Sequence, residues 1–139
     1  MLLLDTHVWI WSVEGNQRRI GRRARRLMTH AEAQGSLRVS TATVFEVMAL
    51  VAAGRLKLSR SPEQWIRDGL ASPGVRVADV SLDIAVDAGS IPRLALADPL
   101  DRFLVATARK LDATLMTADA QVLAYAAATD RVRVVDAGH

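Results

Sequence analysis

The chain has 139 residues, of which 50% are hydrophobic and 4% aromatic, and a formal net charge of +3 at pH 7. This length suits one compact domain and is too short for two ordinary ones, so we interpret residues 1–139 as a single domain. Because the chain has no cysteine, disulfides, thiolate metal sites and cysteine nucleophiles are excluded. The first residues lack the basic segment of a signal peptide, and no uncharged stretch approaches the roughly 18 residues of a membrane span. We therefore expect a soluble, cytoplasmic protein with no membrane partner.

Short apolar strands alternate with helical segments along the chain. We predict strands at residues 2–4, 38–40, 75–77, 114–116 and 132–135, and helices at 6–13, from the Arg-rich segment to about 35, and at 43–53, 61–71, 82–88, 98–110 and 119–127. Gly54 is a typical helix end, and Ser61-Pro62 and Asp98-Pro99 are typical helix starts. The alternation predicts an α/β fold in which helices cover both faces of a five-stranded parallel sheet.

Four carboxylates stand where apolar stretches end or are interrupted. They are Asp5, Glu46, Asp98 and Asp119. In an open parallel sheet the ligand site lies outside the carboxyl ends of the strands, so acids at strand exits and in adjoining helices can meet there. Two carboxylates about 4 Å apart repel by roughly 4 kcal/mol at an effective dielectric near 20, which is a large part of a domain's stability. A convergent quartet therefore needs divalent cations or protons at neutral pH.

Each of these acids also has a local interpretation. Three of them directly precede predicted helices or open them, where a carboxylate commonly caps the helix N-terminus. Glu46 follows Thr43 at the spacing of a capping box, an explanation that fails if Ser40 or Thr41 is the true cap. A glutamate among apolar neighbours would be costly without a cation or hydrogen-bond partners, which favours the functional interpretation.

Three further polar residues adjoin the quartet and could support a cation without binding it directly. They are Thr6, Asp101 and Thr117. Asp101 stands at the capping-box position after Asp98, so it supports either the site or the helix start. Thr117 could cap the helix that begins near Asp119 or hold a metal-bound water.

Oxygen ligands select hard cations, Mg²⁺ or Mn²⁺, over zinc, because there is no cysteine and His7, His30 and His139 are scattered. We expect His7 to be a packing or supporting residue. Phosphate-binding P-loop, serine-hydrolase and zincin motifs are missing from the chain. Paired hard cations are suited to phosphodiester hydrolysis, in which one activates water and the other stabilises the departing oxygen.

Arginine dominates the basic residues, since only Lys57 and Lys110 of the 18 are lysines. Six arginines lie between Arg18 and Arg26, in a segment whose apolar residues recur at helical spacing and are expected to face the core: Ile20, Ala24, Leu27, Met28 and Ala31. The arginines then face outward, either as a solvated surface or as a phosphate-binding one. The candidate RNA-binding residues are Arg22, Arg25, Arg26 and Arg102.

Several segments, in order and over nearly the whole chain, resemble the motifs of PIN-domain ribonucleases, and VapC-type toxins of toxin-antitoxin pairs above all. These segments are residues 1–11, Val39-Ser40 leading to Glu46, Gly54-Arg55-Leu56, residues 98–103 and residues 114–119. The resemblance implies a Mg²⁺- or Mn²⁺-dependent endoribonuclease, a homodimer and inhibition by a cognate antitoxin.

Carried over by position, Asp5, Glu46, Asp98 and Asp119 match the acidic quartet of that family, with Asp5 and Asp98 as direct metal ligands. Relatives often have a histidine and another polar residue where this chain has Leu96-Ala97, and a tryptophan where Phe45 stands. These departures leave the RNA target open, although no carboxylate is lost.

Two other functions remain compatible with parts of this pattern. Aspartate-dependent phosphatases of the haloacid type also begin with a strand-terminal aspartate, but they need an acid two residues later, where this chain has His7. A non-catalytic binding module on the same fold would retain RNA or partner contacts without chemistry, and the presence of all four acids argues against it. Cleavage of small phosphomonoesters tests the first rival, and saturable Mn²⁺ binding tests the second.

Overall fold

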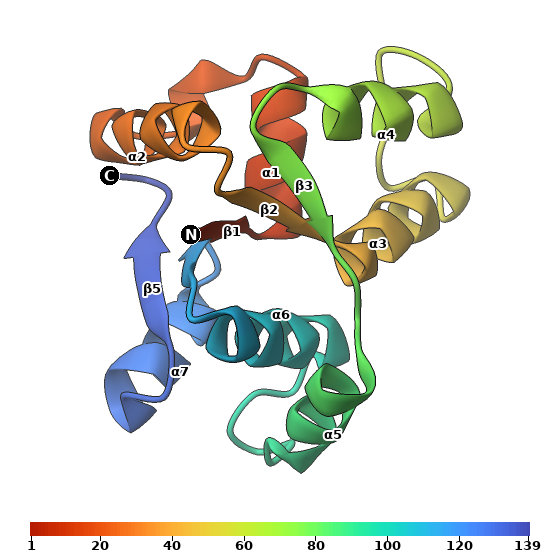
Figure 1. Ribbon diagram of the computed structural model, residues 1–139. Coiled ribbons are helices and arrows are strands. Elements are labelled where there is room, and N and C mark those ends of the chain that lie inside the picture. The colour runs from red at the N-terminus through yellow and green to blue at the C-terminus, as the bar shows by residue number, and fades with distance from the viewer.

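Five parallel strands form one sheet in the order β3-β2-β1-β4-β5 (Figure 1). The computed structural model describes residues 1–139. The strands are β1 (Leu2–Leu4), β2 (Leu37–Ser40), β3 (Val75–Ala78), β4 (Thr114–Thr117) and β5 (Arg133–Asp136). The helices are α1 (Thr6–Val13), α2 (Arg22–Ala33), α3 (Thr41–Ala52), α4 (Pro62–Ala71), α5 (Leu82–Ser90), α6 (Pro99–Leu111) and α7 (Ala120–Thr129), with a 3₁₀ turn at Gln17–Arg19. The predicted single α/β domain with a five-stranded parallel sheet is confirmed.

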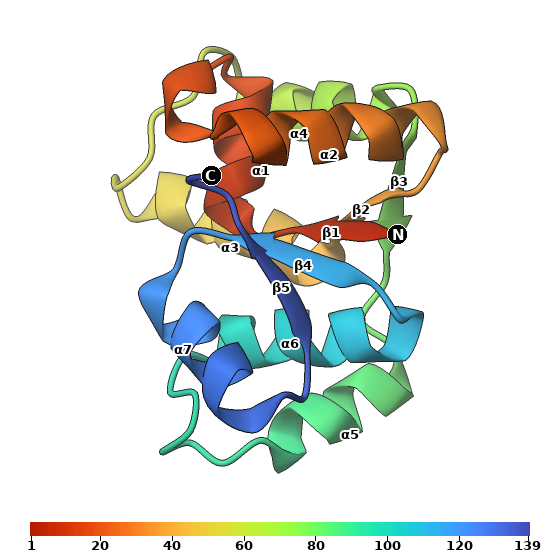
Figure 2. The same cartoon turned by 90° about the vertical axis from the view of Figure 1, so that its left-hand side faces the viewer.

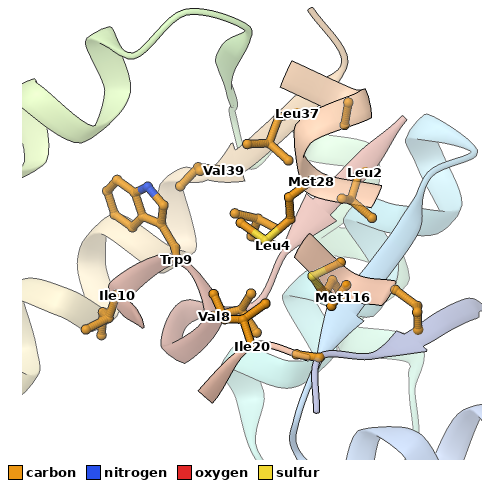
Figure 3. Packing of buried hydrophobic residues seen from close by; sticks show 14 of the residues in the cluster. Leu2, Leu4, Val8, Trp9, Ile10, Ile20, Met28, Leu37, Val39 and Met116 are labelled. Carbon is orange, nitrogen blue, oxygen red and sulfur yellow. The ribbon is translucent and has the colours of Figure 1, made fainter. Parts of the chain in front are cut away.

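Helices cover both faces of this sheet, as the prediction required. In Figure 2, α1, α2 and α4 lie above the strands and α5, α6 and α7 lie below them. Because side chains alternate across a strand, Leu2 and Leu4 of β1 enter the core on the first side, together with Met28 (Figure 3). Leu3 enters the second core, on the side of the sheet that α6 covers, together with Leu104 of α6. The uninterrupted apolar run of β1 thus reflects burial on both faces.

Two details of the predicted helices differ in the structure. Helix α2 begins only at Arg22, because Gly21 adopts an extended conformation and Ile20 precedes the helix. Ile20, Ala24, Met28 and Ala31 are buried as expected, whereas Leu27 is 36% exposed. Leu27 departs from the predicted core because residues 24, 28 and 31 already form the buried stripe, and position 27 lies at its edge.

The apolar helix α3 is also less buried than its sequence indicates. Ala42, Thr43 and Val47 are its buried residues, whereas Phe45 is 63% exposed and Met48 38% exposed. One face of α3 therefore packs against the domain and the other presents apolar side chains at the surface.

The chain reverses its direction of winding across the sheet between β1 and β4. From β1 it proceeds outward through β2 to β3, and it then returns to β4, which pairs with the other side of β1. In open parallel sheets the crevice beside such a reversal, outside the carboxyl ends of the strands, is where ligands bind. None of the seven helices is both long enough and apolar enough to cross a membrane.

Candidate metal centre

Five carboxylates line one cavity of about 200 Å³ at this crevice. Its lining residues are Asp5, His7, Trp11, Glu46, Asp98, Asp101, Ala118 and Asp119. They come from the loops after β1 and β4, from α1 and α3, and from the start of α6. The four acids singled out in the sequence therefore lie together, and Asp101 is a fifth.

Both carboxylate oxygens of Asp5 accept hydrogen bonds, one from the backbone and one from a side chain. Asp5 follows β1 directly, is 8% exposed, and caps α1 by accepting a hydrogen bond at 2.6 Å from the backbone nitrogen of Thr6. Its other carboxylate oxygen accepts one at 2.5 Å from the Thr117 hydroxyl, at the end of β4. Asp5 thus has both the local role of a helix cap and a place in the cavity.

Thr117 connects the two central strand ends. Its buried hydroxyl donates to Asp5 and accepts a hydrogen bond at 3.0 Å from the backbone nitrogen of Asp119. The single hydroxyl hydrogen is used by Asp5, so orientation of a water by Thr117 would require another rotamer. In this structure, Thr117 sets the orientation of the Asp5 carboxylate.

Burial raises the pKa of Asp5 above its ordinary value, and the nearby charge of Asp119 adds to this effect. The hydrogen bonds from Thr117 and Thr6, and the proximity of His7, act in the opposite direction because they favour the carboxylate form. A carboxylate that is desolvated and yet held by two donors is suited to binding a cation that replaces its hydration.

Glu46 enters the cavity from the second turn of α3. Ser40 is the true cap of this helix, since its side chain accepts a hydrogen bond at 3.0 Å from the backbone nitrogen of Ala42. The capping-box explanation for Thr43 and Glu46 is therefore wrong. Burial raises the pKa of Glu46, opposed by the neighbouring Thr6 hydroxyl and reinforced by the charges of Asp5 and Asp98.

Loss of the Ser40 cap should destabilise the protein and loosen α3. Ser40 is fully buried, so we expect Ser40→Ala to lower the free energy of unfolding by about 1 kcal/mol, measured by urea denaturation. Ser81→Ala is the matched control, because Ser81 caps α5 by accepting from the backbone nitrogen of Ile84 and α5 supplies no cavity residue. Ser81→Ala should lower the free energy of unfolding by a comparable amount without changing the affinity for Mn²⁺. Equal stability of Ser40→Ala and the unaltered protein would contradict this role.

The start of α6 supplies two carboxylates in different environments. Asp98 is exposed and caps α6 by accepting a hydrogen bond at 2.9 Å from the backbone nitrogen of Leu100. Asp101, one turn later, is only 7% exposed. Burial, followed by repulsion from Asp98, Asp119, Asp5 and Glu46, raises the pKa of Asp101 to about 8. The negative charges of the other four acids thus all raise the pKa of Asp101.

Four helices begin at the rim of this cavity. Helices α1, α3, α6 and α7 have Asp5, Ser40, Asp98 and Asp119 as their N-caps, and each cap side chain accepts a backbone hydrogen bond. The positive ends of the helix dipoles offset part of the repulsion among the acids. Burial first, and repulsion from neighbouring acids second, still raise the pKa values of Asp5, Glu46 and Asp101.

The donor set fits a hard divalent cation, because it consists of carboxylate oxygens and contains no thiolate. No three acidic or histidine side chains are already assembled at coordinating distance. Binding of a cation in the cavity would offset the cost of burying these carboxylates, which is the main cause of the three raised pKa values, as well as the repulsion between them.

Two aromatic residues line the cavity, of which Trp11 was not recognised from the sequence. His7, expected to pack or to support the site, is exposed at the cavity wall, and Trp11 beside it is half-buried. The signal that could have found Trp11 is its spacing of four residues after His7 along α1, which brings the two side chains to a common face.

The candidate RNA-binding arginines divide into two groups. Arg22, Arg25 and Arg26 are exposed on α2 and line a shallow surface together with His30. Arg102 is half-buried on α6 and donates a weak hydrogen bond at 3.4 Å to the carbonyl oxygen of Ala97. The three α2 residues are thus available for phosphate contacts at the surface, whereas Arg102 is less accessible and its buried Nε has no hydrogen-bond partner.

Fold and cavity together define an α/β protein with an acidic site at the sheet reversal, and comparison with known proteins gives its family. The PIN domain model matches residues 2–128, so the chain belongs to the PIN domain family. PIN domains are generally nucleases and typically depend on divalent metals. No curated protein matches the sequence.

Solved structures share this fold at low sequence identity. A chain of VapBC2 from Rickettsia felis, bound to a promoter DNA fragment, is 12% identical with a TM-score of 0.68, covering 97% of both chains. A chain of DNA-bound VapBC from Salmonella typhimurium is 20% identical with a TM-score of 0.65, covering 97% of this chain and 96% of that one. A chain of FitAcB from Neisseria gonorrhoeae is 23% identical with a TM-score of 0.66, covering 100% and 99%.

Proposed function

We propose that this protein is a Mg²⁺- or Mn²⁺-dependent endoribonuclease that acts as the toxin of a toxin-antitoxin pair. The observation that carries the proposal is the convergence of five carboxylates in one cavity, two of them buried, with raised pKa values at Asp5, Glu46 and Asp101. Membership of a family of metal-dependent nucleases supports the chemistry.

In this proposal Asp5 and Asp101 are the principal cation ligands. Asp101 takes the direct role that the sequence resemblance assigned to Asp98, because Asp101 is buried among the other acids while Asp98 is exposed and caps α6. Glu46, Asp98 and Asp119 complete the site from its rim. A bound cation of this class supplies an activated water and charge stabilisation for phosphodiester hydrolysis.

Other residues of the chain position the Asp5 carboxylate or attract the substrate. Thr117 and the backbone of Thr6 hold the two oxygens of Asp5 in place. Arg22, Arg25 and Arg26 on α2 contribute favourable charge for an RNA backbone. Without a cation, the acids of the cavity repel a phosphate, so substrate binding and cation binding are expected to be coupled.

The partners follow from the same proposal. We infer that a cognate antitoxin inhibits the enzyme in the cytoplasm, since similar folds occur in the VapBC and FitAcB complexes. We also infer a homodimer, supported by the exposed apolar side chains Phe45 and Met48 on α3. Light scattering of the purified chain measures the dimer directly.

Incubation of the purified protein with total cellular RNA tests the function. We expect discrete cleavage with Mg²⁺ or Mn²⁺ and none with EDTA, and mapping of the cut ends identifies the target. Saturable Mn²⁺ binding should accompany the activity. A protein that binds Mn²⁺ but leaves RNA intact would refute the nuclease, and one that binds no Mn²⁺ would refute the metal centre itself.

A further inference from the structure

An aromatic pair on α1 forms one wall of the acidic cavity. His7 and Trp11 are four residues apart and therefore lie on the same face of the helix. Their ring centroids are 6.3 Å apart and their planes are tilted by 54°. Both line the cavity that contains Asp5 and Glu46, so two aromatic rings, tilted toward one another, adjoin the carboxylates.

Core packing accounts for the other two tryptophans but only partly for Trp11. Trp9 and Trp65 are 2% and 0% exposed, and they pack edge to face with centroids 4.8 Å apart. Trp11 contacts the same core but remains half-buried. Part of its ring therefore faces the cavity and solvent. The cavity side of the ring is bordered mainly by carboxylates.

A cationic side chain lies over the ring of this tryptophan. The guanidinium carbon of Arg19, in the 3₁₀ turn between α1 and α2, lies 5.4 Å from the centroid of the Trp11 ring. Arg19 is exposed and forms no ion pair with a carboxylate. Stacking on a ring orients a guanidinium while leaving its N–H groups free for a phosphate.

We propose that His7, Trp11 and Arg19 form a nucleotide-binding subsite next to the metal centre, in which an unpaired RNA base stacks on the aromatic pair and Arg19 binds the adjacent phosphate. The proposal rests on the proposed nuclease function and deepens it, because it names residues that bind the substrate beside the metal centre. A base within a duplex already has its two faces stacked and cannot use such a subsite.

Tryptophan fluorescence tests the subsite without catalysis. Since Trp9 and Trp65 are buried, Trp11 is the tryptophan that a ligand can reach. We expect a short single-stranded RNA oligonucleotide to quench the fluorescence of the cleavage-impaired Asp5→Asn protein in Mg²⁺, and we expect no quenching when Trp11→Phe is added. Equal quenching with and without Trp11 would overturn the proposal.

Kinetics separate binding from chemistry. Base stacking on an aromatic residue corresponds to roughly a tenfold change in affinity or more, so Trp11→Leu should raise KM for single-stranded RNA about tenfold while kcat changes little. Arg19→Gln should act in the same direction and more strongly at low salt. Arg76→Gln is the matched control, because Arg76 is exposed on the edge strand β3, outside the cavity.

The outcomes distinguish this inference from the function on which it rests. If the unaltered protein cuts no RNA with Mg²⁺ or Mn²⁺, the nuclease proposal fails. If it cuts RNA, but Arg19→Gln keeps the KM of the unaltered protein or duplex RNA is cut as readily as single strands, only the subsite fails. Because Arg19 is exposed, its variant carries the test even if Trp11→Leu does not fold.

Discussion

Asp5→Asn should reduce Mg²⁺-dependent RNA cleavage by at least about 10³-fold, which corresponds to roughly 4 kcal/mol of transition-state stabilisation. The physical reason is that Asp5 is the buried acid whose two oxygens are fixed by Thr6 and Thr117. An amide removes the negative charge that attracts the cation. Single-turnover cleavage of a mapped RNA substrate measures the loss, and Mn²⁺ titration should show weakened binding.

The fold should survive this change. Asparagine is as good a helix cap as aspartate, so α1 retains its start, and the variant no longer buries a charge. Circular dichroism and thermal unfolding check this expectation. Asp79→Asn is the matched control, since Asp79 is exposed and lies outside the cavity, and it should cleave RNA normally. Normal RNA cleavage by Asp5→Asn itself would contradict the assignment of Asp5 as a cation ligand.

The metal-free protein should become less stable as the pH rises from about 4 to about 8. The pKa of Asp101 is raised from an ordinary 3.8 to about 8 in the folded state, so in this range the folded chain retains a proton that the unfolded chain loses. The free energy of unfolding therefore falls with pH, by at most about 1.4 kcal/mol per pH unit for this one group. The raised pKa values of Asp5 and Glu46 act with the same sign.

Urea denaturation in EDTA across this pH range measures the effect. Asp101→Asn should flatten the dependence and stabilise the protein at pH 8, whereas Asp79→Asn should leave the slope unchanged. Millimolar Mg²⁺ should oppose the loss, and more at pH 8 than at pH 5, because it binds the deprotonated cavity and only the folded state contains that cavity. A stability that does not vary with pH in EDTA would contradict the raised pKa values that burial and repulsion give these acids.

Much of the fold could be predicted because its signals are local. A three-residue apolar run such as Leu2–Leu4 is typical of a strand buried on both faces, and the structure places alternate leucines in opposite cores. Asp98-Pro99 correctly marked the start of α6. The start of α2 was less clear, because the helical spacing extended back to Ile20 while the extended conformation of Gly21 delays the helix to Arg22.

Which acids of the site are buried and which are exposed could not be predicted from such local signals. Asp98 and Asp101 share one motif, and both positions are compatible with a helix start. Their difference in burial depends on how α6 packs against the sheet and on which acids reach it from β1, β4 and α3. The exposure of Phe45 likewise depends on which face of α3 meets the domain.

The amino-acid sequence by itself determined the secondary structure, the parallel sheet and the identity of the acids at the strand exits. These follow from hydrophobic periodicity, capping residues and glycine positions, which act over a few residues. Only the tertiary structure decided that the buried acids Asp5 and Asp101 share one cavity, that His7 and Trp11 line it, and that Arg19 lies over Trp11. The physical reason is that desolvation and repulsion depend on distances between segments remote in sequence, and only chain packing sets those distances.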